Sequence, residues 1–211
     1  MTTFNGFSQK DFDVFTINGL DERMTELKSR ISPKLQDIAE RLEPTVSSLA
    51  GDQMYIHVAK HARRKTNPPN DTWAALANNQ RGYKKLPHFQ IGMWESHVFI
   101  WFAVIYESPI KEDFAKQLKS NKQEILSQIP DNFVWSKDHT KPETISHKDV
   151  KDREFDELVE RLETVKKAEI LCGQVFNRDD ERLQDEETMM ELFDEAVRTL
   201  MPLYNLTKKL Q

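Results

Sequence analysis

The sequence is poor in the residues that build disulfide frameworks and flexible linkers. It contains a single cysteine, Cys172, so the chain can form no internal disulfide and no metal site built on paired cysteines. Only six of the 211 residues are glycine, and no low-complexity segment divides the chain. Because Cys172 lies in the apolar run AEILCGQVF, we expect a buried and unreactive thiol.

Long hydrophobic runs are also missing. No stretch reaches the ~18 uninterrupted apolar residues of a membrane-spanning helix, and residues 1–19 lack the apolar core and small-residue cleavage site of a secretion signal. Hydrophobic residues make up 38% of the chain and charged residues 31%, a balance typical of folded proteins that dissolve in water. We therefore expect a cytoplasmic protein with no membrane partner.

Sequence motifs of catalysis are absent too. The chain has neither the G-x-S-x-G elbow of serine hydrolases nor a phosphate-binding P-loop. His57 and His61 are four residues apart, which on a helix would suit one metal ion, but on the strand expected here they would lie about 13 Å apart. His88 and His97 bracket a predicted hairpin and could approach each other across it, although hydrogen-bonded or exposed histidines are commoner. The sequence thus predicts no metal site and identifies neither a cofactor nor a catalytic residue.

Helical periodicity begins at residue 20. Apolar residues recur there at intervals of three and four up to residue 49. Pro33, with Ser32 as its N-cap, predicts two helices or one kinked helix, ending near Pro44; these two prolines disfavour the alternative of a coiled coil. Further amphipathic helices are predicted between Ser108-Pro109 and Pro130, over residues 155–165, and over about residues 186–209.

Strand patterns lie between these helices. MYIHVAKH alternates apolar and polar residues, and the runs PHFQIGMW and HVFIWFAVIYE, separated by Glu95 and Ser96, predict a hairpin whose second strand lies in the middle of the sheet. Short strands are expected in NFVWS, PETIS and AEILCGQVF, and residues 60–85 are interpreted as one long ordered loop. The prediction is a single α+β domain over residues 1–211: a mixed or antiparallel β-sheet of undetermined strand order, covered by amphipathic helices, with helical N- and C-terminal segments.

Positive charge is concentrated in that long loop. The net charge of the chain is −5, which argues against a protein that coats nucleic acid. Residues 60–85 carry seven cations against Asp71 alone, a local balance of +6 that leaves −11 for the remainder. The cations are Lys60, Arg63, Arg64, Lys65, Arg81, Lys84 and Lys85.

This distribution predicts a site for an anion. Arginine can bind phosphate or carboxylate through two hydrogen bonds, and Trp73 and Tyr83 offer rings on which a base can stack. The predicted ligand-binding residues are Lys60, Arg63, Arg64, Lys65, Trp73, Arg81, Tyr83 and Lys84. The alternative is a solvated basic surface, in which Trp73 and Leu76 only anchor the loop to the core.

A resemblance to a known family rests on several segments. The run from HVAKHARRKTNPPNDTW to FIWFAVIYE, with FTINGLDERM and ISPKLQ before it and SPIKEDFAK and LMPLYNL after it, resembles the YktB-like proteins of bacilli and lactobacilli. The resemblance covers the whole chain. It implies a single-domain cytoplasmic α+β protein, and it supplies no assigned activity or catalytic residues to transfer.

Three functions remain open from the sequence. The first is a binding or regulatory module for an anionic small molecule or a short single-stranded nucleic acid. The second is a hydrolase or transferase in which His57, His61 or His88 acts as acid or base. The third is a protein-interaction scaffold that uses the apolar face of residues 20–49 or the acidic start of the last helix, where the carboxylates of residues 179–195 are expected to be solvated. The oligomeric state is not predicted.

Overall fold

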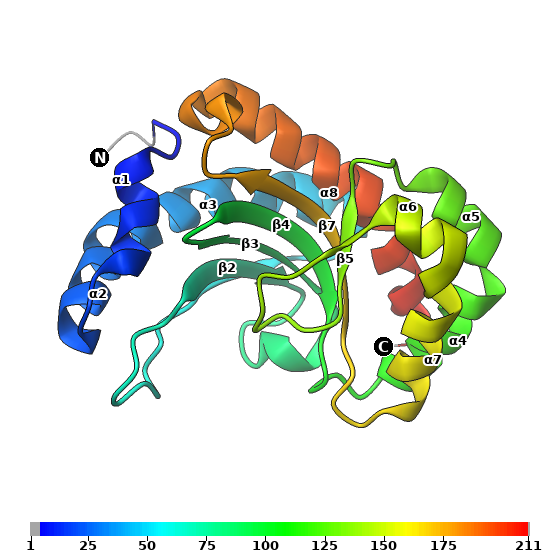
Figure 1. Cartoon of the computed structure of the whole chain (residues 1–211). Helices are drawn as coiled ribbons and strands as arrows, with labels where there is room; N and C mark the ends of the chain where they lie inside the picture. The colour runs from blue at the N-terminus through cyan, green and yellow to red at the C-terminus, as the bar shows by residue number, and fades with distance from the viewer. Residues whose placement is uncertain (1–4, 211) are drawn as a thin grey trace.

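A seven-stranded antiparallel sheet forms the centre of the structure, a computed structural model that describes residues 5–210 (Figure 1). The strand order is β1-β2-β3-β4-β7-β5-β6, and every neighbouring pair is antiparallel. The strands are β1 (Tyr55–Val58), β2 (Asp71–Ala77), β3 (His88–Trp94), β4 (His97–Val104), β5 (Val134–Ser136), β6 (Ile145–Ser146) and β7 (Ile170–Asn177). The predicted α+β class is confirmed; residues 1–4 and 211 of the predicted domain lie outside the described residues.

The interpretation of residues 60–85 as one loop is wrong. Asp71–Ala77 form β2, which pairs with β1 on one side and β3 on the other. Three of its seven residues are alanine, a residue with weak β-propensity, so the segment DTWAALA carries little strand signal of its own. The two neighbouring strands satisfy its backbone groups from both sides, and two shorter loops, residues 59–70 and 78–87, replace the long one.

The central hairpin is confirmed. β3 and β4 are joined through Glu95 and Ser96. β4 is fourth in the order of the seven strands, and all of its residues are buried. His88 and His97, which could have approached each other across the hairpin, do not meet and are each hydrogen-bonded elsewhere, the commoner outcome. His88 pairs with Ala103 at one end of the hairpin, whereas His97 starts β4 at the other end. An antiparallel pair places the first residue of one strand opposite the last residue of its partner, so the two first residues lie far apart.

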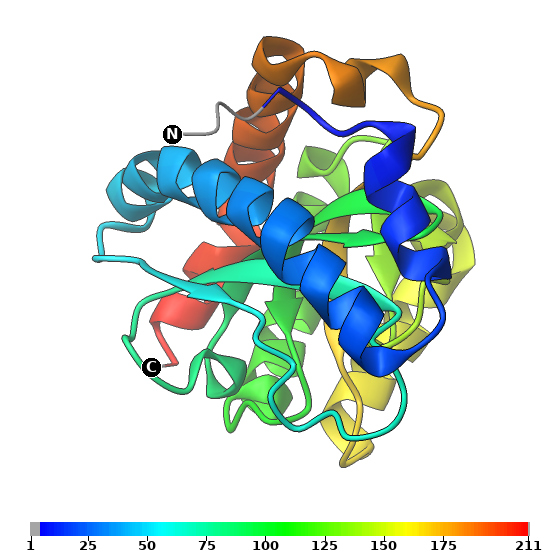
Figure 2. The ribbon, with the colours of Figure 1, turned by 90° about the vertical axis from the view of Figure 1, so that its left-hand side faces the viewer.

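The predicted helix over residues 20–49 exists, but its boundaries differ. α2 (Leu20–Glu26), a π-helical turn (Leu27–Ile31) and α3 (Ser32–Ala50) form one continuous helical run that crosses the molecule (Figure 2). Ser32 is already helical and is not an N-cap, and Pro44 lies inside α3, which ends at Gly51. The free energy gained by burying the apolar face of α3 outweighs the cost of the backbone hydrogen bond that Pro44 cannot donate.

Of the remaining helices, those in three regions, residues 108–130, 155–165 and 186–209, lie at predicted positions, whereas the short helices at residues 9–12 and 147–149 were not predicted. The remaining helices are α1 (Gln9–Phe12), α4 (Lys111–Ser120), α5 (Lys122–Gln128), α6 (His147–Asp149), α7 (Phe155–Thr164) and α8 (Glu186–Lys208), with short 3-10 turns at Asp13–Thr16, Tyr83–Lys85 and Glu181–Gln184 and a second π-helical turn at Val150–Glu154. Asn121 separates α4 from α5 within the segment predicted as one helix. Within residues 5–210, no helix has both the length and the apolar character needed to cross a bilayer.

One face of the sheet is covered by helices. Tyr204 of α8 stacks on Phe89 of β3, with ring centroids 5.7 Å apart, and Phe114 of α4 meets Phe102 of β4. Cys172 lies in this core, and burial raises the pKa of its thiol well above the usual value. The predicted buried, unreactive cysteine is confirmed.

We call the opposite side of the sheet the loop-covered face. Its apolar floor is made of Trp94, Phe99, Trp101, Ala103, Ile105 and Leu171, against which Trp73, Val134 and Val175 pack. A loop of residues 137–144, between β5 and β6, crosses in front of the strands in Figure 1. Residues 59–70 and 78–87, which carry the basic residues, precede and follow β2.

Candidate ligand-binding site

Two aromatic residues of the predicted site are joined directly. The indole Nε1–H of Trp73, on β2, donates a hydrogen bond of 2.7 Å to the hydroxyl of Tyr83. The Tyr83 ring lies 5.0 Å from the ring of His57 and 5.1 Å from that of His88. Lys84 places its ammonium group 6.0 Å from the centre of the Trp73 ring, within range of a cation–π contact. The loop of residues 78–87 therefore contributes two predicted ligand residues, Tyr83 and Lys84, to a cluster around Trp73 of β2.

His61 adds a neutral imidazole to the edge of this cluster. Its Nε2 lies 3.1 Å from the hydroxyl of Thr72, and its ring meets that of Trp73 edge-on at 5.5 Å. Burial lowers the pKa of His61 to about 4, and the positive charges of Arg64 and Lys84 act in the same direction. The backbone of His61 is left-handed, with φ at 49°, a conformation that costs a residue with a side chain about 1–3 kcal/mol. The loop is therefore held in a constrained shape.

Asp71 is the buried carboxyl group of the cluster. It begins β2, is 8% exposed, and has a pKa raised by burial to about 6. The positive charges of Arg64 and Lys84 oppose that rise, as does His139 in its protonated form. These three groups come from the loops of residues 59–70, 78–87 and 137–144, respectively. Charges from three separate segments thus converge on one position.

The far end of the loop of residues 59–70 is tied to the helical N-terminal segment. Arg23 of α2 is buried, and its guanidinium donates to the carbonyl oxygens of Ile17 and Pro69, both at 2.9 Å. Burial lowers the pKa of Arg23 from its usual value. This anchor fixes the chain immediately before Asp71, so Arg64 reaches the cluster from a loop restrained at both ends.

The other predicted cations do not join this cluster. Lys60, Arg63, Lys65 and Arg81 are exposed, and their side chains make no hydrogen bond or ion pair with any described residue. The eight predicted ligand residues therefore divide into two groups. Trp73, Tyr83 and Lys84 are in contact with one another. Arg64 is exposed like the other cations and makes no side-chain hydrogen bond or ion pair with a described residue, but its charge acts on His61 and Asp71. Their role in binding stays a prediction.

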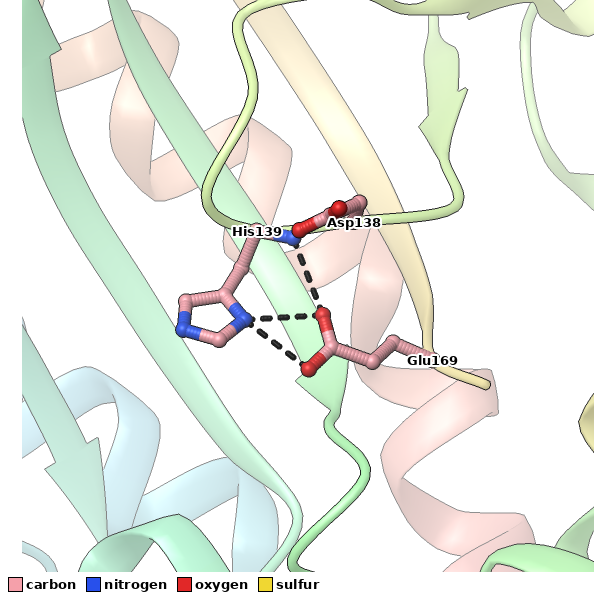
Figure 3. Close-up of side chains that lie close together, drawn as sticks. All are labelled: Asp138, His139 and Glu169. Atoms are coloured by element: carbon pink, nitrogen blue, oxygen red, sulfur yellow. Dashed lines mark hydrogen bonds and ion pairs between the residues drawn. The ribbon is translucent and has the colours of Figure 1, made fainter. Parts of the chain in front are cut away.

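A histidine and a glutamate outside the predicted set form the strongest polar pair of this face. The ring Nδ1 of His139 lies 2.8 and 3.0 Å from the two carboxylate oxygens of Glu169, and the backbone N–H of His139 donates to the same group at 2.9 Å (Figure 3). Glu169 is 4% exposed, and it also accepts from the backbone N–H of Tyr106 at 3.4 Å. The pair fixes the loop of residues 137–144 against the start of β7.

Sequence reasoning missed this pair because its members are thirty residues apart and belong to no short motif. The one signal in the sequence was Glu169 itself, an acidic residue directly before the apolar strand ILCGQVFN. A carboxylate at that place is buried as soon as the strand enters the sheet, and a buried carboxylate needs partners.

Asp138 extends the pair to three groups that could hold a metal ion. One ligand atom each of Asp138, His139 and Glu169 lie within 4.8 Å of one another. A zinc ion takes about 2.0–2.2 Å to each nitrogen or oxygen ligand, so an ion on the line between Nδ1 and the carboxylate needs roughly 4 Å. The observed separation of 2.8 Å has room for a proton alone on that line. Asp138 is moreover engaged by the backbone N–H and hydroxyl of Thr140. The distances favour a hydrogen-bonded pair.

The histidines that the sequence suggested as acids or bases are engaged otherwise. His57 Nε2 lies 2.8 Å from the carbonyl oxygen of Asn79. His88 is fully buried between the carbonyl oxygen of Leu86 and the side chain of Gln90, and burial lowers its pKa to about 4. These contacts give both residues structural roles in the walls of the site.

A hollow of about 390 Å³ opens at the edge of the loop-covered face. It is lined by Phe15, Asn70, Trp94, Glu95, Ser96, Pro142 and Arg178. Trp94 is the register partner of Asp71, and Asn70 and Pro142 belong to two of the three loops. The volume lies in the range of about 300–1,000 Å³ that is usual for small-molecule sites.

A larger, shallower hollow of about 940 Å³ lies between α3 and the start of α8. Two of its carboxylates are paired: Glu186 contacts Arg41, and Asp194 contacts Arg198. Asp185 caps α8 by accepting from the backbone N–H of Thr188. This agrees with the expectation that the acidic segment forms the solvated start of the last helix.

Comparison with known proteins identifies the family. Residues 7–204 match the model of a family described as a domain of unknown function, DUF1054. The chain belongs to this family. It is 51% identical to a UPF0637 protein of Bacillus velezensis over 96% of this chain and 97% of the relative, and 44% identical to a UPF0637 protein of Bacillus cytotoxicus over 98% and 100%. The predicted membership of a bacterial family without an assigned activity is confirmed. Because the family supplies no activity, the function proposed below is argued from the candidate site.

Proposed function

We propose that this protein binds a small phosphate-bearing ligand, of which a nucleotide is the best fit, at the loop-covered face. The observation that supports the proposal is that Lys84 lies over the ring of Trp73, which is hydrogen-bonded to Tyr83, and that the charges of Lys84 and of Arg64, from different loops, both act on Asp71 and His61. Arginine can hold a phosphate through two hydrogen bonds, and lysine adds a less directional charge.

The charge balance of the cluster supports an anion. The cluster holds the basic side chains of Arg64 and Lys84, a His61 whose pKa burial lowers to about 4, and one buried carboxyl group, Asp71. The exposed cations Lys60, Arg63, Lys65, Arg81 and Lys85 surround the cluster and raise the local positive potential. A phosphate therefore meets an excess of positive charge.

The aromatic residues suit the other half of a nucleotide. Trp73 is half-buried and fixed by its hydrogen bond to Tyr83, so its ring is held in place before any ligand arrives. Stacking of a base on such a ring contributes about 1–3 kcal/mol. The hollow beside Trp94 offers volume for a ligand of that size.

A thermal-shift screen tests the proposal with the full chain. AMP, ATP, inorganic phosphate and adenosine are compared at 50 and 500 mM salt, because surface electrostatic attraction weakens as salt rises. A ligand at about 100 times its Kd stabilises the folded state by about 2.7 kcal/mol. We expect a salt-sensitive rise in Tm with AMP that exceeds the rise with phosphate or adenosine alone.

Two matched pairs of variants locate the site. Arg64→Ala and Lys84→Ala are expected to remove most of the AMP-dependent shift, whereas Arg63→Ala and Lys85→Ala remove one neighbouring exposed charge each and are expected to keep it. Equal losses in both members of each pair would show a diffuse basic surface, and no shift with any of the four compounds would refute the proposal.

A further inference from the structure

We propose that the loop-covered face is catalytic, with His139 as the general base of a hydrolytic reaction in which water attacks a phosphate ester bound by Arg64 and Lys84. This inference rests on the proposed ligand site. It adds a reaction to that site and a residue to carry it.

The orientation of His139 suits this role. Nδ1 faces the carboxylate of Glu169, so the proton of the neutral imidazole resides on Nδ1 and Nε2 carries the lone pair. Nε2 points away from Glu169 in Figure 3 and makes no hydrogen bond with a described residue. A carboxylate that fixes the tautomer of a histidine and leaves its second nitrogen available is the arrangement found in acid–base dyads and triads.

Glu169 is itself held firmly. Its carboxylate is almost fully buried and accepts from two backbone N–H groups, those of His139 and Tyr106, besides the imidazole. Among the described residues, His139 is the only histidine paired with a carboxylate. Glu169 is thus a positioning residue, which acts on the reaction through His139.

His139 also lies near the proposed ligand. A positive charge on His139 lowers the pKa of Asp71, at the start of β2, and that of His88, at the start of β3. These two residues stand at opposite ends of the paired strands β2 and β3, because Asp71 pairs with Trp94 and Leu76 with Phe89. The loop that carries His139 crosses in front of the strands in Figure 1, and Pro142 of the same loop lines the hollow beside Trp94.

The reaction balances without a further reactant. Nε2 takes a proton from water as the water oxygen forms a bond to phosphorus and the bond from phosphorus to the leaving oxygen breaks. The imidazolium then gives the proton to the leaving oxygen, and Glu169 stays ionised and stabilises the imidazolium. Arg64 and Lys84 compensate charge on the phosphoryl oxygens.

The test measures hydrolysis of bis(p-nitrophenyl) phosphate and p-nitrophenyl phosphate by the full chain, together with AMP binding by calorimetry. We expect p-nitrophenol release by the wild type, a fall in kcat of about 100-fold or more in His139→Gln, and a KM within about threefold. Glu169→Gln is expected to lower kcat and to shift the acidic limb of the pH profile, which the protonation of His139 sets. Glu160→Gln, an exposed carboxylate of α7, is the control and should keep both parameters.

The outcomes separate the two proposals. AMP binding without release of p-nitrophenol from either ester overturns the reaction and leaves the ligand site standing. Turnover that His139→Gln does not lower also overturns it. If neither AMP binding nor turnover occurs, the proposed function fails and this inference fails with it.

Discussion

The carboxylate of Glu169 accepts hydrogen bonds from the ring Nδ1–H and from the backbone N–H of the same residue, His139, at 2.8 and 2.9 Å. One buried side chain therefore fixes both the position of a loop and the orientation of the imidazole that this loop carries. A substitution at Glu169 is therefore expected to change both the stability of the loop of residues 137–144 and the orientation of the His139 ring.

Replacing Glu169 by alanine is expected to loosen that loop. The substitution removes the acceptor of three hydrogen bonds, and a bond to a charged group contributes about 1.5–3 kcal/mol. We expect the free energy of unfolding to fall by about 2–4 kcal/mol and the amide of His139 to exchange its hydrogen faster. Urea unfolding and hydrogen exchange measure the two effects. Unchanged protection of the His139 amide would contradict the description of the pair.

Asp71 is expected to make stability depend on pH. Its pKa is about 6 in the folded protein, against 3.8 for an ordinary Asp, so the folded state holds the proton more tightly than the unfolded chain. The free energy of unfolding therefore falls as pH rises from about 4 to 6 and stays lower above that range. Asp71→Asn should gain about 2 kcal/mol more stability at pH 7.5 than at pH 4.5.

Urea unfolding at both pH values measures this gain, with Asp152→Asn, an exposed carboxylate, as the control. An equal effect of Asp71→Asn at the two pH values would show that the Asp71 carboxyl group titrates normally.

Tyr83→Phe tests the link between the two aromatic residues. The variant leaves the indole N–H of half-buried Trp73 without its acceptor, which costs about 1–2 kcal/mol. Tyr106→Phe, at a site 43% exposed, is the matched control and should cost little. Denaturant titration followed by tryptophan fluorescence reports both. Similar unfolding midpoints for the two variants would mean that the Trp73–Tyr83 bond does not contribute.

Gly173→Ala tests the packing beneath the loop-covered face. An added Cβ would lie 1.9 Å from the carbonyl oxygen of Ile100 and 2.7 Å from the ring of Trp101. Because Ile100 is in the central strand and cannot move away, we expect a loss of about 3 kcal/mol or more. At Gly82 nothing lies within 4 Å of an added Cβ, and only the left-handed backbone opposes Gly82→Ala, at about 1 kcal/mol. Equal thermal midpoints for the two variants would contradict this account.

Local pattern was sufficient to predict most elements of the fold. The hairpin of β3 and β4, the last helix and the strand around Cys172 each carry a strong periodic or apolar signal over seven or more residues. β2 does not, because its alanines and the neighbouring basic residues resemble a loop until β1 and β3 pair with it. Pro44 predicted the end of a helix that in fact continues to Ala50, because burial of the apolar face of α3 outweighs the tendency of proline to end a helix.

The candidate site could be predicted only in part, for a similar reason. The cations of residues 60–85 marked its location, because charge density is visible along the chain. The sequence could not show which of them act on the same groups, because Arg64 and Lys84 lie on different loops that β2 separates along the chain. His139 and Glu169 were out of reach because a loop and a distant strand must come together before either has a partner.

The central claim is that Arg64 and Lys84 form a phosphate site at the loop-covered face, and calorimetric titration of AMP into the wild type, Lys84→Ala and Lys85→Ala tests it most directly. The account predicts measurable binding that Lys84→Ala weakens by at least about tenfold, which corresponds to about 1.4 kcal/mol, while Lys85→Ala leaves the Kd nearly unchanged. Equal binding by all three proteins, or no heat of binding in any of them, would contradict it.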